Sequence, residues 1–392
     1  MSILMPKAQQ ESLRKEISDM LGIPKKTVDL APEHRGSLSH DGLIIEKWVF
    51  TAEEGSKVPC ILYRPEGAQK PMPAVVITNG HGGSKNSLYI LYTAQLYAKM
   101  GLACLVYDTI GEEERHLNGE KGTRAHDDSC ADKAASDSGR IMLGKMIFDT
   151  MRALDFLEAR EDIDKTRLGV VGNSLGGAVS AWMTALEGRL HSAIVSGFIL
   201  GEYSRKYGKA CTRIPSLKLE PICSDEDFIR LHMPHCAVLY MNGEKDAVMD
   251  PDGDGLYCRT IRKLAGENIR LEKLAGLPQR TGIYFDPEGG HRAYHNHKEA
   301  LLWLHGEGML PAASRRQIEE MPEITMEAWC LKHGFSWEAQ SAKLYWVQVN
   351  HQGAKFADAN IRPIPPEDLK CLRPDELGDD AYTLEGWLKA IS

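Results

Sequence analysis

The middle of the chain alternates short, continuously apolar segments with segments of helical periodicity. Between residues 73 and 304 the apolar segments are, in order, PAVVITNG, GLACLVYD, RLGVVGN, HSAIVSG, HCAVLYMNG and TGIYFD. Strands that are apolar along their whole length are buried on both faces, as in a parallel sheet that helices cover on both sides. The sequence therefore predicts an α/β fold with a mostly parallel, doubly wound sheet.

The part of the chain before this region has a different pattern. Two β-rich runs between Gly42 and Gly67 meet at the letters EEGS and predict an antiparallel hairpin at the front edge of the sheet. Residues 11–21 have helical spacing and stop before Gly22 and Pro24, so we expect an N-terminal helix packed on the body.

After Pro311 the alternation fails, and proline and charged residues become more frequent. Four tryptophans remain in this part, too many large apolar side chains for a disordered tail: Trp329, Trp337, Trp346 and Trp387. We predict an N-terminal helical segment at 1–40, an α/β domain at 41–311 and a C-terminal extension at 312–392. The extension is expected to pack on the body or on a partner subunit, which allows a homo-oligomer.

Composition and charge argue against several classes of function. The 392 residues carry a formal net charge of -8 and contain no block of Lys and Arg, so we expect no nucleic-acid partner. No apolar run reaches the roughly 18 residues that span a bilayer, and the N-terminus lacks the order of a signal peptide. We therefore expect a soluble, cytoplasmic protein without membrane partners, although a secreted chain that had lost its leader would show the same pattern.

The nine cysteines are an odd number and include no C-x-x-C pair. Their scatter argues against both a zinc site and a dense disulfide framework, and several lie in apolar runs where a buried thiol is expected. We accordingly expect neither a metal nor an organic cofactor.

One serine stands between glycines directly after an apolar strand. The stretch VVGNSLGG places Ser174 between Gly172 and Gly176, where a strand is predicted to turn into a helix. In a Gly-x-Ser-x-Gly nucleophile elbow, strain in the backbone lifts the serine hydroxyl above the strand, and the glycines leave room for neighbouring elements. Ser174 is therefore a candidate nucleophile, with a tight turn that merely needs glycine as the alternative.

A serine nucleophile requires a base to take its proton and usually a carboxylate to orient that base. In this kind of fold the three follow one another in the order serine, acid, histidine. Of the fourteen histidines, His291 alone directly follows a Gly-Gly pair that closes a predicted strand. We expect His291 to be the base.

The acid is expected at the end of the strand CAVLYMNG, where the chain continues as Gly-Glu-Lys-Asp. This position gives Asp246, which lies at the same edge of the sheet as Ser174 and His291. Three nearby carboxylates compete with it: Glu244, Asp250 and Asp252.

Two metal-site alternatives arise near these residues. The run from Asp250 to Gly255 resembles a calcium loop, but Ile261 occupies the twelfth position, where a bidentate glutamate is needed. His291, His295 and His297 also lie close together in sequence, yet no acidic ligand accompanies them at a suitable spacing. We interpret His295 and His297 as surface-helix histidines.

An oxyanion formed at Ser174 requires two N–H donors. The N–H of Leu175, directly after the serine, is expected to be one of them. The other is expected from the glycine-rich loop after PAVVIT, which reads NGHGGSK; the sequence leaves His81, Gly82 and Gly83 open as the donor, and a flexible turn is the alternative reading.

Taken together, these motifs resemble the α/β-hydrolase superfamily, and within it the dienelactone-hydrolase-like and acetyl-xylan-esterase-like members. The resemblance covers roughly residues 42–310 and is carried by NGHGGSK, YDTIGEEER, DKTRLGVVGNSLGG, NGEKD and EGGH, in that order. It implies that residues 41–311 form a catalytic domain and that Asp108 braces the neighbouring loop. It also implies ion pairing, without a chemical role, for Asp149, Arg152 and Asp155.

The resemblance implies a serine esterase that acts on small polar acyl esters, including acetylated or otherwise esterified carbohydrate. The segment 112–140 is long and charged where a lipase carries an apolar lid, which argues against lipid substrates. Alternatives are a prolyl-oligopeptidase-like peptidase, a hydrolase of C–C, lactone or amide bonds, and a catalytically silent binding scaffold. The peptidase is disfavoured because only about seventy residues precede the strand PAVVIT, too few for a propeller domain.

Overall fold

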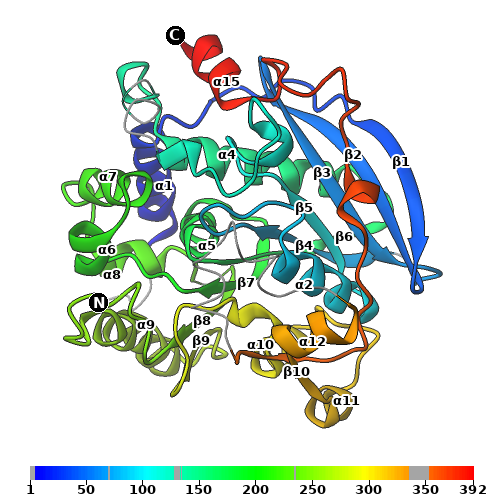
Figure 1. Ribbon diagram of the computed structural model, residues 1–392. Helices are drawn as coiled ribbons and strands as arrows, with labels where there is room; N and C mark the ends of the chain where they lie inside the picture. The colour runs from blue at the N-terminus through cyan, green and yellow to red at the C-terminus, as the bar shows by residue number, and fades with distance from the viewer. Residues whose placement is uncertain (1–4, 69–70, 128–132, 134, 234, 335–352) are drawn as a thin grey trace.

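The computed structural model describes residues 5–68, 71–127, 133, 135–233, 235–334 and 353–392 (Figure 1). Their main sheet has nine strands in the order β1-β2-β3-β5-β4-β6-β7-β8-β9. The six strands from β5 to β9 in this order run parallel, and β1, β2 and β3 add antiparallel pairings at one edge. The strands are β1 (Glu33–His40), β2 (Leu43–Glu53), β3 (Ser56–Pro65), β4 (Met72–Thr78), β5 (Ala103–Tyr107), β6 (Ile163–Asn173), β7 (Leu190–Ser196), β8 (Ala237–Gly243) and β9 (Thr281–Asp286).

The predicted fold class and the predicted hairpin are both confirmed. Strands β4, β5 and β8 are buried along their whole length, as their continuous apolar sequences require. The hairpin of β2 and β3 turns at Glu54 and Gly55, and Gly55 has a φ of 70°. Strand β1 was not predicted, because its sequence EHRGSLSH is polar and lies at the exposed edge.

Helices cover both faces of the sheet. On one face lie α1 (Lys7–Met20), α4 (Met142–Glu158), α5 (Leu175–Leu186) and α9 (Leu256–Leu274), whose apolar side chains form one core cluster with the strands. On the other face lie α2 (Leu88–Lys99) and α10 (Lys298–Gly306), which contribute to a second cluster. The sheet is thus doubly wound, as expected.

Three short helices between β7 and β8 were not predicted. They are α6 (Glu202–Tyr207), α7 (Ala210–Leu219) and α8 (Asp225–Arg230). They lie together on the side of the molecule that carries α1 and α9 (Figure 1). Their sequence mixes charged and apolar residues and contains Pro215 within α7, so it has no clear helical periodicity.

The described part of the C-terminal extension contacts the body of the same chain. It contains α11 (Arg315–Glu320), α12 (Met326–Lys332), α15 (Leu384–Ile391) and a two-stranded sheet of β10 (Glu323–Thr325) and β11 (Lys355–Ala357). Trp329 and Trp387 are buried, and the Trp387 indole N–H donates to Glu53 at 3.0 Å. Trp337 and Trp346 lie outside the described residues. The predicted domain boundaries at residues 40 and 311 stay predictions.

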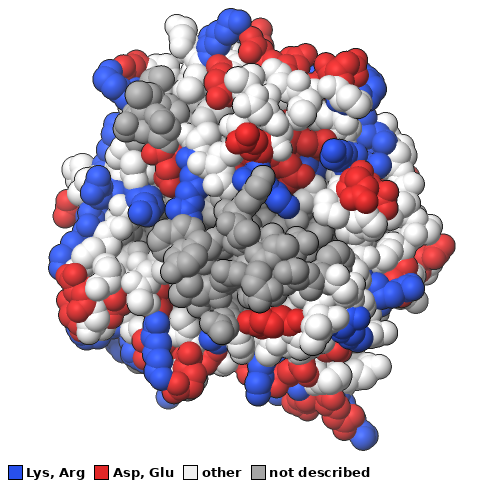
Figure 2. Space-filling model, in the orientation of Figure 1, with Lys and Arg blue, Asp and Glu red and all other residues white. Residues whose placement is uncertain are grey.

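On the face shown in Figure 2, basic and acidic side chains are interspersed. None of the described helices combines the length and the apolar character that crossing a membrane requires.

Candidate active site

Ser174 occupies a sharp turn between β6 and α5. Its backbone has φ 59° and ψ −117°, a left-handed conformation that is strained for any residue with a Cβ atom. The Ser174 N–H donates to the carbonyl of Ser196 at 3.0 Å, which ties the turn to the end of β7. The hydroxyl-bearing side chain is partly exposed, while both flanking residues are buried.

The glycines around Ser174 are required by close backbone packing. A Cβ atom on Gly172 would lie 2.2 Å from Oγ1 of Thr78, and one on Gly176 would lie 2.2 Å from the Thr78 carbonyl oxygen. A Cβ atom on Gly177 would lie 2.2 Å from the carbonyl oxygen of Ser196. The turn therefore has the geometry of a nucleophile elbow.

His291 and Asp246 meet at the same edge of the sheet. Nδ1 of His291 lies 2.8 Å from Oδ2 of Asp246, and both side chains are buried. Oδ1 of Asp246 accepts the N–H groups of Val248 at 3.1 Å and Met249 at 2.9 Å, so both carboxylate oxygens have partners. This arrangement fixes the imidazole with a proton on Nδ1 and leaves Nε2 as the acceptor.

The three competing carboxylates have other partners. Asp250 accepts the N–H of Gly255 at 2.8 Å, Asp252 pairs with Lys206, and Glu244 pairs with Arg262. Asp246 is therefore the carboxylate that the structure brings to His291.

Ser174 and His291 line one cavity of about 400 Å³. The glycine-rich loop contributes Gly80 and His81 to its wall, and the segment after β5 contributes Arg124. Sequence analysis missed the opposite wall, to which α6 and the start of α7 contribute side chains: Tyr203, Tyr207, Lys209 and Thr212.

A glycine beside the histidine was also missed. Gly197 has a φ of 61°, and a Cβ atom there would lie 3.1 Å from Cε1 of His291 and 2.8 Å from Oδ1 of Asn173. The sequence signal for this position was a glycine directly after the apolar run of β7. Gly197 leaves the space that the imidazole occupies.

The three candidate oxyanion donors lie in different surroundings. The N–H of Gly83 already donates to the carbonyl of Gly80 at 2.9 Å. A Cβ atom on Gly82 would face Gly122 and Arg124. Gly80 packs against Ser174, and His81, the next residue, lines the cavity.

Buried ion pairs brace this region, as the resemblance implied. The backbone N–H of Lys85 donates to Asp108 at 3.0 Å, and the Lys85 ammonium also pairs with Asp108. Asp149 accepts from Arg115 at 2.8 Å and from Lys145 at 2.7 Å. Arg152 pairs with Asp155.

The interpretation of His295 and His297 as surface-helix histidines is wrong. Both are buried beneath the loop that carries His291, at and beside a short 3₁₀ turn (Tyr294–Asn296). Burial lowers the pKa of each to about 3. Both histidines follow the loop after a buried strand, and this position could have indicated that the chain returns to the core there.

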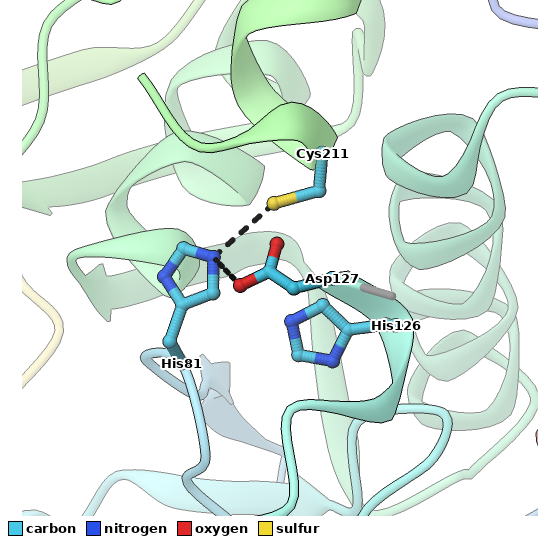
Figure 3. Close-up of side chains that lie close together, drawn as sticks. All are labelled: His81, His126, Asp127 and Cys211. Carbon is cyan, nitrogen blue, oxygen red and sulfur yellow. Dashed lines mark hydrogen bonds and ion pairs between the residues drawn. The ribbon is translucent and has the colours of Figure 1, made fainter. Parts of the chain in front are cut away.

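Another group of side chains had no sequence signal. His81, His126, Asp127 and Cys211 come from three separate segments and lie together beside the cavity (Figure 3). His126 and Asp127 belong to a 3₁₀ turn (Ala125–Asp127), and Cys211 belongs to α7.

Comparison with known proteins shows what the chain is similar to. The sequence model of the acetyl xylan esterase family matches residues 40–215, which include the elbow and the glycine-rich loop. YtaP of Bacillus subtilis (strain 168), which is named as a hydrolase, is 28% identical over 158 residues. That match covers 38% of this chain and 50% of YtaP, so it spans half the length of this relative.

Solved structures share the fold at low sequence identity. The methylesterase BT1017 superposes with a TM-score of 0.56 at 18% identity, covering 86% of this chain and 74% of its own. A Bacteroides fragilis protein described as an acetyl xylan esterase gives 0.55 at 16% identity, covering 71% and 75%. A glucuronoyl esterase from Solibacter usitatus gives 0.55 at 14% identity, covering 78% and 92%.

The chain has the α/β-hydrolase fold. The predicted resemblance to this superfamily, and within it to acetyl-xylan-esterase-like proteins, is confirmed.

Proposed function

We propose that the protein is a serine carboxylic-ester hydrolase. Ser174 is the nucleophile, His291 is the base, and Asp246 orients the imidazole. The observation that carries this proposal is that Ser174, on a strained turn, lines the same cavity as a histidine whose Nδ1 is held by a buried carboxylate.

The proposed reaction has two stages. Oγ of Ser174 attacks the carbonyl carbon of the ester while its proton passes to Nε2 of His291, a buried atom that has no hydrogen-bond partner among the described residues. His291 then gives this proton to the departing alkoxide. In the second stage a water molecule, deprotonated by His291, attacks the acyl group and releases the acid, and the proton returns to Ser174.

We assign the oxyanion donors to the N–H groups of Leu175 and His81. Leu175 is the first residue of α5, where the N–H groups have no acceptor within the helix. Of the three loop candidates, His81 follows the glycine that packs on Ser174, whereas the N–H of Gly83 already has an acceptor. Gly82 and Gly83 therefore shape the loop without donating.

The substrates we propose are small polar acyl esters, including acetylated or otherwise esterified carbohydrate. Support comes from the match to the acetyl xylan esterase family and from two cationic side chains in the cavity wall, Arg124 and Lys209. A cytoplasmic location and self-association through residues 312–392 remain part of this proposal.

The test is acetate release from acetylated xylo-oligosaccharides, compared with hydrolysis of 4-nitrophenyl acetate, butyrate and octanoate. We expect acetate release and a preference for the shortest ester, both absent in Ser174→Ala. A preference for octanoate would contradict the substrate class. Cleavage of amide substrates at a higher kcat/KM than esters would favour the peptidase alternative, and no labelling of Ser174 by a phosphonate would favour a silent scaffold.

A further inference from the structure

Four side chains beside the cavity have the donor atoms that transition metals bind. Nε2 of His81 lies 3.2 Å from Sγ of Cys211 and 3.2 Å from Oδ2 of Asp127. One donor atom from each of these residues and from His126 can be chosen so that all lie within 4.8 Å of one another. Figure 3 shows the four side chains converging from the glycine-rich loop, the 3₁₀ turn and α7.

Hydrogen bonding among the described residues satisfies this group only in part. His126 is fully buried; its ring meets the backbone of Ile110, but neither ring nitrogen reaches full hydrogen-bond geometry with a described residue. Oδ1 of Asp127 is also buried without a hydrogen-bond partner among the described residues. Buried polar atoms that lack partners are rare in folded proteins and destabilise them, so this concentration beside Cys211 requires an explanation.

We propose that His81, His126, Asp127 and Cys211 bind one divalent transition-metal ion, with Zn²⁺ as the ion that the donor set fits best. Four ligands drawn from imidazole, thiolate and carboxylate are typical of tetrahedral Zn²⁺. One thiolate and one carboxylate balance the two positive charges of the ion, so the filled site is neutral, as its buried surroundings require. The ion would accept a lone pair from one ring nitrogen of His126 and so give that buried atom a partner.

Each of these side chains can present a donor atom to the ion. A neutral imidazole at His126 has one ring nitrogen with a lone pair that can bind a metal. Oδ2 of Asp127 lies 3.2 Å from Nε2 of His81 and so faces the other donors. Cys211 binds as the thiolate, and its proton passes to solvent as the metal enters. Partial exposure of His81 and Asp127 provides an entry path.

The ion would join three segments that are distant in sequence. It would tie the loop after β4 to the 3₁₀ turn and to α7, and His81 and Thr212 of this group of segments line the cavity. Because we assign the His81 N–H to the oxyanion, a metal on the His81 ring would also hold that donor in place; this consequence alone rests on the proposed function.

The test is a titration of the full-length, chelator-treated protein with Co²⁺, followed by displacement with Zn²⁺. We expect one ion per chain, a thiolate-to-Co²⁺ charge-transfer band, and release of a proton on binding. Cys211→Ala is expected to abolish the band, and His126→Gln to weaken affinity beyond the ~10–100-fold that loss of an outer-shell partner costs. Cys104→Ala, which removes a buried thiol from β5, is the matched control and keeps the band.

Absence of stoichiometric binding by the wild-type chain would overturn the proposal, as would equal affinity in the wild type, Cys211→Ala and His126→Gln. Wild-type binding is measured without any substitution, so misfolding of a variant does not leave the result open. Ser174→Ala is expected to bind Co²⁺ like the wild type, so failure of the metal site and failure of the proposed catalysis are told apart.

Discussion

Asp246 holds His291 through one oxygen and is itself held through the other. Its Oδ2 lies 2.8 Å from Nδ1 of His291, and its Oδ1 accepts the N–H groups of Val248 and Met249. In an asparagine the amide oxygen would keep the two backbone N–H groups, so the NH₂ would face Nδ1 and favour the wrong tautomer. We predict that Asp246→Asn lowers kcat for 4-nitrophenyl acetate by about 10⁴-fold while the fold is retained.

The control for this prediction is Asp252→Asn. Asp252 lies in the same loop but is exposed and pairs with Lys206. Its substitution is expected to leave kcat within a few-fold of the wild type. Equal losses in the two variants would contradict the assignment of Asp246.

Because the backbone at Ser174 is strained, we predict that relieving the strain stabilises the protein while removing the nucleophile abolishes its activity. A glycine tolerates φ 59° without strain, whereas alanine keeps the Cβ atom and therefore the strain. Ser174→Gly is expected to exceed Ser174→Ala in free energy of unfolding by about 1 kcal/mol, measured by urea denaturation, with both variants inactive. An alanine variant as stable as the glycine variant would show that the turn is relaxed.

The packing of the elbow predicts that Gly177 tolerates no side chain. A Cβ atom there would lie 2.2 Å from the Ser196 carbonyl oxygen, a rigid backbone atom. Gly177→Ala is expected to lower the free energy of unfolding by about 1–3 kcal/mol. Gly188→Ala is the matched control because nothing lies within 4 Å of its Cβ position, and chemical denaturation of both variants makes the comparison.

Buried histidines predict a loss of stability in acid. Burial lowers the pKa of His232 to about 4, its Nδ1 donates to the Cys236 carbonyl at 3.0 Å, and its Nε2 accepts from the Asn268 amide at 3.1 Å. Between the folded pKa and the ordinary value of about 6.5, the unfolded chain binds a proton that the folded chain does not. The free energy of unfolding therefore falls as pH falls through this window, by on the order of 3 kcal/mol from this group.

Urea denaturation between about pH 7.5 and pH 4.5 measures this effect, with the window set by the same two pKa values. His232→Gln is expected to be less stable near neutral pH but to lose less stability toward acid. A variant whose stability falls as steeply as that of the wild type would contradict the assignment of a neutral, buried His232.

The sheet and the proposed triad could be predicted because their signals are local. Continuous apolar runs predict buried parallel strands; Ser174 directly follows such a run, and Asp246 and His291 lie in the loops that follow two others. Parallel strands end at one edge, so sequence order is enough to bring these side chains to the same region. The elbow adds a further local signal, because the Gly-x-Ser-x-Gly pattern lies within five consecutive residues.

Strand β1 and helices α6–α8 could not be predicted from the same signals. Strand β1 is a polar edge strand without a buried face, although Asp41-Gly42, which forms the two-residue turn to β2, was an available hairpin signal. The short helices α6–α8 depend on tertiary contacts more than on periodicity. Helices α6 and α7 supply one wall of the cavity, so sequence alone left its shape undetermined.

The group around His126 shows the limit of reasoning from spacing. The expectation of no metal depended on patterns within short segments: no C-x-x-C pair, an incomplete calcium loop and histidines without a matching acidic ligand. The side chains of His81, Asp127 and Cys211 come from three segments that only the folded chain brings together. Local motifs do not detect such a site.

The most direct test of the central claim is the turnover of 4-nitrophenyl acetate by the wild type and by Ser174→Ala at matched circular dichroism. The two proteins differ by one oxygen atom at the proposed nucleophile. We predict a loss of kcat on the order of 10⁶-fold, down to the background rate. Hydrolysis by the variant at the wild-type rate would contradict the account, because it would place the reaction at a group other than Ser174.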